Sequence, residues 1–193
     1  VNVAGTMTDK GTTTVDLLTN DTVQVNAVVP QSLTFSISSN SISFGNLGSG
    51  FVKYASSTNT AGDTASTSAH NLQIGTNAPS GYTVTVQGQT LTSQQNSNNT
   101  ITAIGNTPAA ISMGTEQFGI RIDEAGGTGV VSAPYAAAGG YAFDSAAFPD
   151  SIASAVSASA NTTYSVRYLA NITANTEAGE YAATMTYVAT ANF

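Results

Sequence analysis

Histidine occurs once in this chain, at position 70, so any site that needs an imidazole must be built around it. A serine triad uses a histidine as its general base, but His70 lies at the end of a polar, low-complexity loop, beside Asn71. The chain has no Gly-x-Ser-x-Gly motif, the turn that exposes the nucleophilic serine of many hydrolases. Cysteine is absent, which excludes thiol catalysis, disulfides and cysteine-ligated zinc. We therefore expect His70 to be a solvated residue at a strand edge.

Pairs of acidic side chains offer a second route to chemistry, because two carboxylates can act together on a glycosidic bond. Three pairs stand close in the sequence: Asp123 with Glu124, Asp144 with Asp150, and Glu177 with Glu180. All fall in predicted turns, where acids are common because they hydrogen-bond to the local backbone. Tryptophan, a frequent lining of sugar clefts, is absent. We predict that the protein is not an enzyme and has no catalytic residues.

The turn at residues 123–127 is the strongest candidate for a metal site. Asp123, Glu124 and the backbone carbonyls near Gly126 and Gly127 are hard oxygen donors of the kind that calcium prefers. The spacing of an EF-hand loop is missing, and a solvated acidic turn accounts for the same residues. We predict no metal and no cofactor.

Charged residues make up only 8% of the chain, against about 25% in ordinary soluble proteins. The formal net charge is −7, and the four basic residues are scattered: Lys10, Lys53, Arg121 and Arg167. Binding to nucleic acid needs clustered cations that displace counterions, so we predict no nucleic-acid partner. Thr, Ser, Asn and Gln carry the polarity instead, which is typical of extracellular β-proteins.

The ends of the chain bear on localisation. No run of about 18 apolar residues is present, so we predict no membrane insertion of the mature chain. The sequence begins Val1-Asn2-Val3, without methionine. We interpret this as a mature extracellular chain at the cell surface, left after removal of a signal peptide; a start chosen for expression would look the same.

The clearest pattern is the alternation of apolar and polar residues from Tyr181 to Phe193, a period of two that is typical of a half-buried strand. Strands are also predicted at 22–29, 33–37, 82–87, 117–122 and 164–172, with Gly, Pro and Asn turns between them. One short helix is predicted at residues 150–160, capped by Asp150 and Ser151. The fold class is therefore all-β: an antiparallel β-sandwich of jelly-roll or Ig-like type.

Residues 1–8 alternate as well, with Val1, Val3, Gly5 and Met7 on one side. A glycine on the apolar side lets a strand press closely against a crowded groove. Two interpretations stay open: a first strand of the domain's own sheet, or a strand donated to a neighbouring subunit. We expect residues 1–10 to be an N-terminal extension, and 11–193 a single β-sandwich domain that a neighbour's strand completes.

Asn-x-Ser/Thr sequons mark candidate sites for covalent glycans. Four occur, at Asn20, Asn98, Asn161 and Asn171. The first three lie in predicted turns or loops, where a glycan fits, and Asn171 lies near a strand end on the side opposite Ile172.

Several short stretches have residue patterns like those of exported prokaryotic surface proteins. They are Val29 to Ile37 (Val-Pro-Gln-Ser-Leu-Thr-Phe-Ser-Ile), Ile42 to Leu47, Ala78 to Val84 and Ala178 to Ala182. In these stretches the chain resembles β-sandwich subunits of surface filaments, of the TasA-like and archaeal pilus kind. The resemblance implies a subunit that is completed by a terminal strand from its neighbour.

We therefore expect a structural subunit of an extracellular filament, a pilus or biofilm fibre, whose partners are copies of itself in a head-to-tail homopolymer. Its donor strand is predicted at residues 1–8, and its groove is lined partly by residues 164–172 and 181–193. A monomeric adhesin or carbohydrate-binding module is the alternative, with an aromatic platform at Tyr135, Tyr141, Phe143 and Phe148. A third interpretation is a coat protein that assembles in two dimensions.

Overall fold

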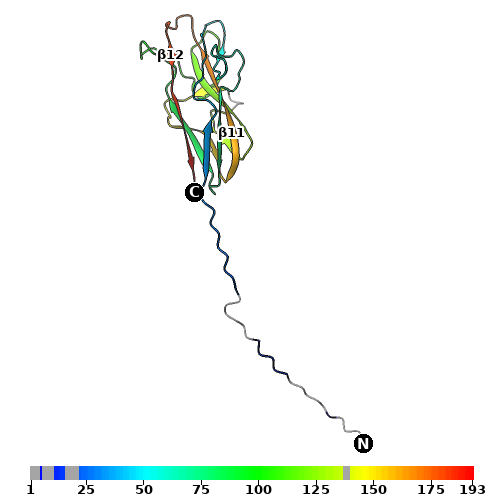
Figure 1. The fold of residues 1–193 in the computed structure, drawn as a ribbon. Coiled ribbons are helices and arrows are strands. Elements are labelled where there is room, and N and C mark those ends of the chain that lie inside the picture. The colour runs from blue at the N-terminus through cyan, green and yellow to red at the C-terminus, as the bar shows by residue number, and fades with distance from the viewer. Residues whose placement is uncertain (1–4, 6–10, 16–21, 137–139) are drawn as a thin grey trace. The chain divides into compact units, whose positions relative to one another are not determined.

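The computed structural model describes residues 5, 11–15, 22–136 and 140–193 (Figure 1). The chain divides into two units, Val1–Pro30 and Gln31–Phe193. The described residues of the second unit form thirteen strands: β1 (Leu33–Ile37), β2 (Lys53–Tyr54), β3 (His70–Thr76), β4 (Tyr82–Gly88), β5 (Thr92–Ser93), β6 (Gly105–Ala109), β7 (Gln117–Ala125), β8 (Val130–Val131), β9 (Tyr141–Phe143), β10 (Asp150–Ala155), β11 (Ser159–Asn171), β12 (Tyr181–Ala182) and β13 (Met185–Ala191). The described residues contain no helix that is long and apolar enough to cross a membrane.

The strands of the second unit form two main sheets. The larger sheet has the order β1-β3-β11-β7-β9-β6, with β2 paired to β11, and the smaller has the order β13-β4-β10-β8. Strands β12 and β5 form a separate two-stranded ladder. All pairings between these strands are antiparallel. The prediction of an all-β, antiparallel sandwich is thereby confirmed.

One hydrophobic core lies between the two sheets. It is built from alternate residues of the long strands, such as Val84 and Val86 of β4, Ile120 of β7 and Val166 of β11, all fully buried. Burial of such a side chain contributes about 1.5–3 kcal/mol. The hydroxyl groups of Tyr82 and Tyr164, which come from opposite sheets, hydrogen-bond at 2.9 Å inside this core. The alternation in the sequence therefore reports the face that each strand buries.

The predicted helix at residues 150–160 is wrong. Residues 150–155 form β10, which pairs with both β4 and β8, and Ser159 begins β11. Ile152, Ala153 and Ala155 are buried in the core. A bulge between Ser151 and Ala153 shifts the register, so that the neighbouring residues Ile152 and Ala153 are both buried. Helix propensity is a weak preference that tertiary pairing overrides, and here two neighbouring strands supply that pairing.

The predicted strand at residues 22–29 is also absent, because residues 22–30 have no regular secondary structure. Their apolar side chains lie in solvent: Val23, Val25 and Val29 are 87%, 86% and 81% exposed. The sequence placed the start of the domain at residue 11, whereas the strand-bearing unit begins at Gln31. Residues 22–29 alternate as a strand does, but within the described part of the chain no strand pairs with them.

The packing of the core predicts a large difference between two matched isoleucine substitutions. Ile120→Ala, in a fully buried position, should lower the free energy of unfolding by about 2–5 kcal/mol, because it leaves a cavity. Ile111→Ala removes the same atoms from a side chain that is 42% exposed and should cost less than about 0.5 kcal/mol. Denaturant titration of both variants checks this, and equal losses would contradict the assignment of the core.

Candidate functional site

One side of the sandwich is open, and the edge strand β1 forms its first wall. Within the described ranges, strand β1 pairs only with β3. Its residues Leu33, Phe35 and Ile37 stand opposite Thr76, Ile74 and Leu72 in the ladder, and so share the inner face of the sheet. Phe35 packs partly against the core, yet Leu33 and Ile37 remain 38% and 42% exposed. The inner face of β1 is therefore covered only in part.

The second wall of the open side is β13, the edge strand of the smaller sheet. Of the strands that the structure describes, β13 pairs only with β4. Its inner residues Met185, Tyr187 and Ala189 pack against the core and are half-buried. The ring of Tyr187 lies 5.5 Å from that of His70 on β3, and its hydroxyl bonds to that of Tyr168 on β11. Strand β13 thus lies over β3 and β11, and among the described residues no strand of the smaller sheet lies beyond it, over β1.

A groove of about 1090 Å³ lies at one end of this open side, where Ile37 of β1 and Met185 and Tyr187 of β13 contribute to its lining. Residues 37 and 39–47 line one side of it, and residues 176–185 line the other. Apolar side chains contribute to the lining, among them Ile101, Phe118 and Ile172. The groove therefore opens directly onto the core of the sandwich.

His70 lies against this groove, and its environment corrects the expectation of a solvated strand-edge residue. It is only 6% exposed, its Nε2 lies 3.0 Å from the hydroxyl oxygen of Tyr168, and its Nδ1 is buried without a hydrogen-bond partner. Burial lowers the pKa of His70 to about 4. The neutral imidazole therefore fills the space between β3, β11 and β13 as a packing residue. The alternation of His70, Leu72 and Ile74 along β3 was the signal that sequence reasoning overlooked.

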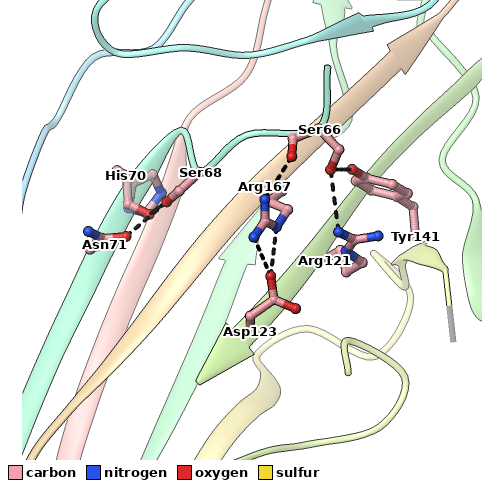
Figure 2. Close-up of polar contacts among 8 residues, drawn as sticks. All are labelled: Ser66, Ser68, His70, Asn71, Arg121, Asp123, Tyr141 and Arg167. Atoms are coloured by element: carbon pink, nitrogen blue, oxygen red, sulfur yellow. Dashed lines mark hydrogen bonds and ion pairs between the residues drawn. The ribbon is translucent and has the colours of Figure 1, made fainter. Parts of the chain in front are cut away.

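A second polar cluster lies on the opposite face of the larger sheet, where two arginines stand side by side (Figure 2). Arg121 of β7 and Arg167 of β11 are partners in the ladder, and both alternate with core residues. Arg167 donates from Nε to Oδ2 of Asp123 at 2.7 Å and forms an ion pair with it at 2.5 Å, and its Nη1 donates to the carbonyl of Ser66 at 2.8 Å. The acidic turn that was weighed as a calcium site therefore has one of its carboxylates bound to an arginine.

Among the carboxylates that the structure describes, none pairs with the guanidinium of Arg121. It lies 5.4 Å from the centre of the Tyr141 ring and donates to the Ser66 hydroxyl at 3.4 Å, and that hydroxyl is 2.6 Å from the hydroxyl of Tyr141. Its Nε is buried without a hydrogen-bond partner. The two arginines hold the irregular segment around Ser66 against the sheet, and we assign them a structural role. Scattered in the sequence, they are brought together only by the pairing of β7 with β11.

The candidate sequons differ in accessibility. Asn98 lies exposed in a loop, and Asn161 is exposed on β11, where its Oδ1 accepts from the Thr34 hydroxyl at 3.2 Å. Asn171 is 1% exposed, and its Nδ2 donates to Oε1 of Gln117 at 2.9 Å. A glycan is attached at this nitrogen, so the folded domain leaves no room for one on Asn171. Asn20 lies outside the described residues.

The residues predicted to form the donor strand fall almost entirely outside the described part of the chain. This applies to Val1, Val3 and Met7, whereas Gly5 is described and exposed. Their role stays a prediction. Of the segments predicted to line an acceptor groove, Tyr168, Ile172, residues 181–185 and Tyr187 line the groove described above, and the acceptor role likewise stays a prediction.

The aromatic platform that was considered for sugar binding is not on the surface. Tyr135, Tyr141 and Phe143 are at most 2% exposed, and Phe148 packs edge-on against Phe143 at a centroid distance of 5.1 Å. Among the described residues, no group of three His, Cys, Asp or Glu side chains is placed to hold a metal ion. These four aromatic side chains are therefore packed inside the domain and form no exposed platform.

Comparison with known proteins adds no relative. No family model, curated protein or solved structure matches this chain.

The burial of His70 predicts a dependence of stability on pH. The pKa of His70 is about 4 in the folded state and about 6.5 when unfolded, so between these values only the unfolded state binds the proton. Stability should therefore be complete above pH 6.5 and fall as the pH drops toward 4, by about 3 kcal/mol in all. The carboxylates titrate in the wild type and in His70→Gln alike. The difference between the unfolding free energies of these two proteins, measured across this pH range, therefore isolates the contribution of His70. Parallel curves of unfolding free energy against pH would contradict it.

The arginine cluster predicts that two cations contribute unequally to stability. Arg167→Gln removes the bonds to Asp123 and Ser66 and should cost about 1–3 kcal/mol, because one partner is charged and partly buried. Lys53→Gln removes the same charge, but Lys53 donates only to the exposed carbonyl of Ala61 at 2.7 Å, so its cost should stay below about 1 kcal/mol. Thermal and denaturant unfolding of both variants measure this, and similar costs would count against the structural role.

Proposed function

We propose that this protein is a structural subunit of an extracellular filament, in which an N-terminal segment of one copy is added as a strand to the open side of the next. The observation that carries the proposal is the pair of half-covered inner faces, on β1 and on β13, which belong to opposite sheets. A strand placed beside β13 would face β1 and complete the smaller sheet.

The composition of the two edges supports strand addition. Soluble proteins commonly protect sheet edges with lysine, proline or inward-pointing charge, because an open edge recruits other chains. Strand β1 reads Leu-Thr-Phe-Ser-Ile and β13 reads Met-Thr-Tyr-Val-Ala-Thr-Ala. Neither contains a charge or a proline, and neither is interrupted by a bulge in its ladder. The two edges thus lack the usual protection against pairing with another chain.

A strand donated from another copy gains main-chain hydrogen bonds along the edge and places alternate side chains into the groove. When each copy both donates and accepts, the contact is head-to-tail and does not close, so it builds a filament. The donor predicted from the sequence alternates Val1, Val3, Gly5 and Met7. Residues Asn98 and Asn161, exposed on the domain, are the sites where such a filament would carry glycans.

Removal of the whole N-terminal unit tests the proposal. The intact chain should form thin fibres in negative-stain electron microscopy, and a variant that lacks residues 1–30 should not, because it can accept a strand but donates none. Added back as a synthetic peptide, residues 1–30 should bind the shortened protein in a one-to-one complex and raise its melting temperature. Fibres formed by the shortened protein, or an intact chain that stays monomeric, would refute strand donation from this unit.

A further inference from the structure

We propose that the donated strand is Thr22–Val29 of a second copy, lying beside β13 and over β1. This assignment rests on the proposed function and names the partner segment of the open side. Val23, Val25, Ala27 and Val29 would face the groove, and Gln24, Asn26 and Val28 would face solvent.

Exposure of the segment is the first argument. Four valines between Thr22 and Pro30, at positions 23, 25, 28 and 29, are each more than 80% exposed. Val23 and Val25 alternate with the polar Thr22, Gln24 and Asn26, and an extended chain places positions 23, 25, 27 and 29 on one side. Valine is enriched in strands because its branched side chain packs well on a pleated surface. The segment thus has the composition of a strand and lacks a sheet of its own, which accounts for the wrong strand prediction at these residues.

Length and boundaries match the vacant position. Eight residues of extended chain span about 26 Å, and β13 is seven residues long. Pro30 has no N–H and cannot continue a ladder, while Asn20 and Asp21 on the other side are typical of turns. The segment contains no charged residue, as is true of β1 and β13. Apolar side chains would therefore meet the half-covered Leu33, Phe35 and Ile37 of the acceptor.

The link to β1 indicates that the acceptor is a second copy. Only Pro30, Gln31 and Ser32 separate the segment from Leu33. A reversal within three residues normally needs a left-handed residue such as glycine, and none is present. Ser32 is already committed to the turn after β3: its N–H donates to Oδ1 of Asn77 at 2.8 Å, and its carbonyl accepts from the Thr76 hydroxyl at 2.7 Å. The short link and the bonds of Ser32 support a second copy as the acceptor.

Residues 1–8 are a competing candidate for the donor strand. The two candidates, residues 1–8 and 22–29, differ in the side chains on their apolar sides. On its apolar side the first segment carries two valines, a glycine and a methionine, and the second carries three valines and an alanine. Glycine inside a strand weakens it, because it has no side chain to pack. The two segments lie in one chain, so matched substitutions can compare them directly.

Fibre assembly of full-length variants tests the assignment. Val25→Asp should reduce the polymerised fraction at least tenfold, because it buries an unpaired charge in the groove. Val3→Asp, the same change in the competing segment, and Val28→Asp, on the solvent side, should polymerise as the wild type does. Loss of fibres in Val3→Asp but not in Val25→Asp would overturn the assignment while strand donation stands. Loss in Val28→Asp would overturn the facing, and an intact chain without fibres would refute strand donation itself.

Single cysteines give a test that does not depend on blocking assembly, since the native chain has no cysteine. In monomers, Val25→Cys and Val28→Cys should both react rapidly with a maleimide. In fibres, the thiol at position 25 should react at least tenfold more slowly, and the thiol at position 28 should react at its former rate. Equal reactivity of the two thiols in fibres would overturn the proposal.

Discussion

The structure depends on the burial of one face of every strand between two sheets. Tyr82 and Tyr164 meet across this interior, and Tyr187 meets His70 and Tyr168 in the same way. The constraint is satisfied where the two sheets face each other and fails at one side, because the larger sheet extends to β1 and the smaller one stops at β13. The smaller sheet covers the inner face of the larger one only as far as its own edge. Leu33 and Ile37 lie beyond that edge and are therefore partly exposed.

Strands with a strong period of two could be predicted from the sequence, because alternation is local and needs no knowledge of the partner. This holds for β4, β13, and most of β7 and β11. Residues 150–155 could not, since their Ser and Ala side chains have weak preferences and β4 and β8 on either side decide their conformation. Residues 22–29 failed for the opposite reason: a strong local pattern is present without a neighbouring strand in the described structure.

The polar sites were harder to predict than the strands, because each is assembled across long separations in the chain. Arg121 and Arg167 become neighbours only through the register of β7 with β11. The burial of His70 is set by Tyr168 and Tyr187, about a hundred residues away in the sequence, so a loop composition that looked solvated was misleading. Aromatic residues 135, 141 and 143 were misread in the same way, since an irregular segment gave no period from which burial could be inferred.

The absence of charge along β1 and β13 has a consequence for the medium in which the protein works. Salt screens interactions between exposed charges over about 10 Å at 0.1 M, but it has little to screen on an edge made of Thr, Ser, Ala and apolar residues. Salts that are excluded from protein surfaces strengthen the burial of apolar side chains. The strength of a contact made along these edges would therefore change little with the ionic strength of the medium.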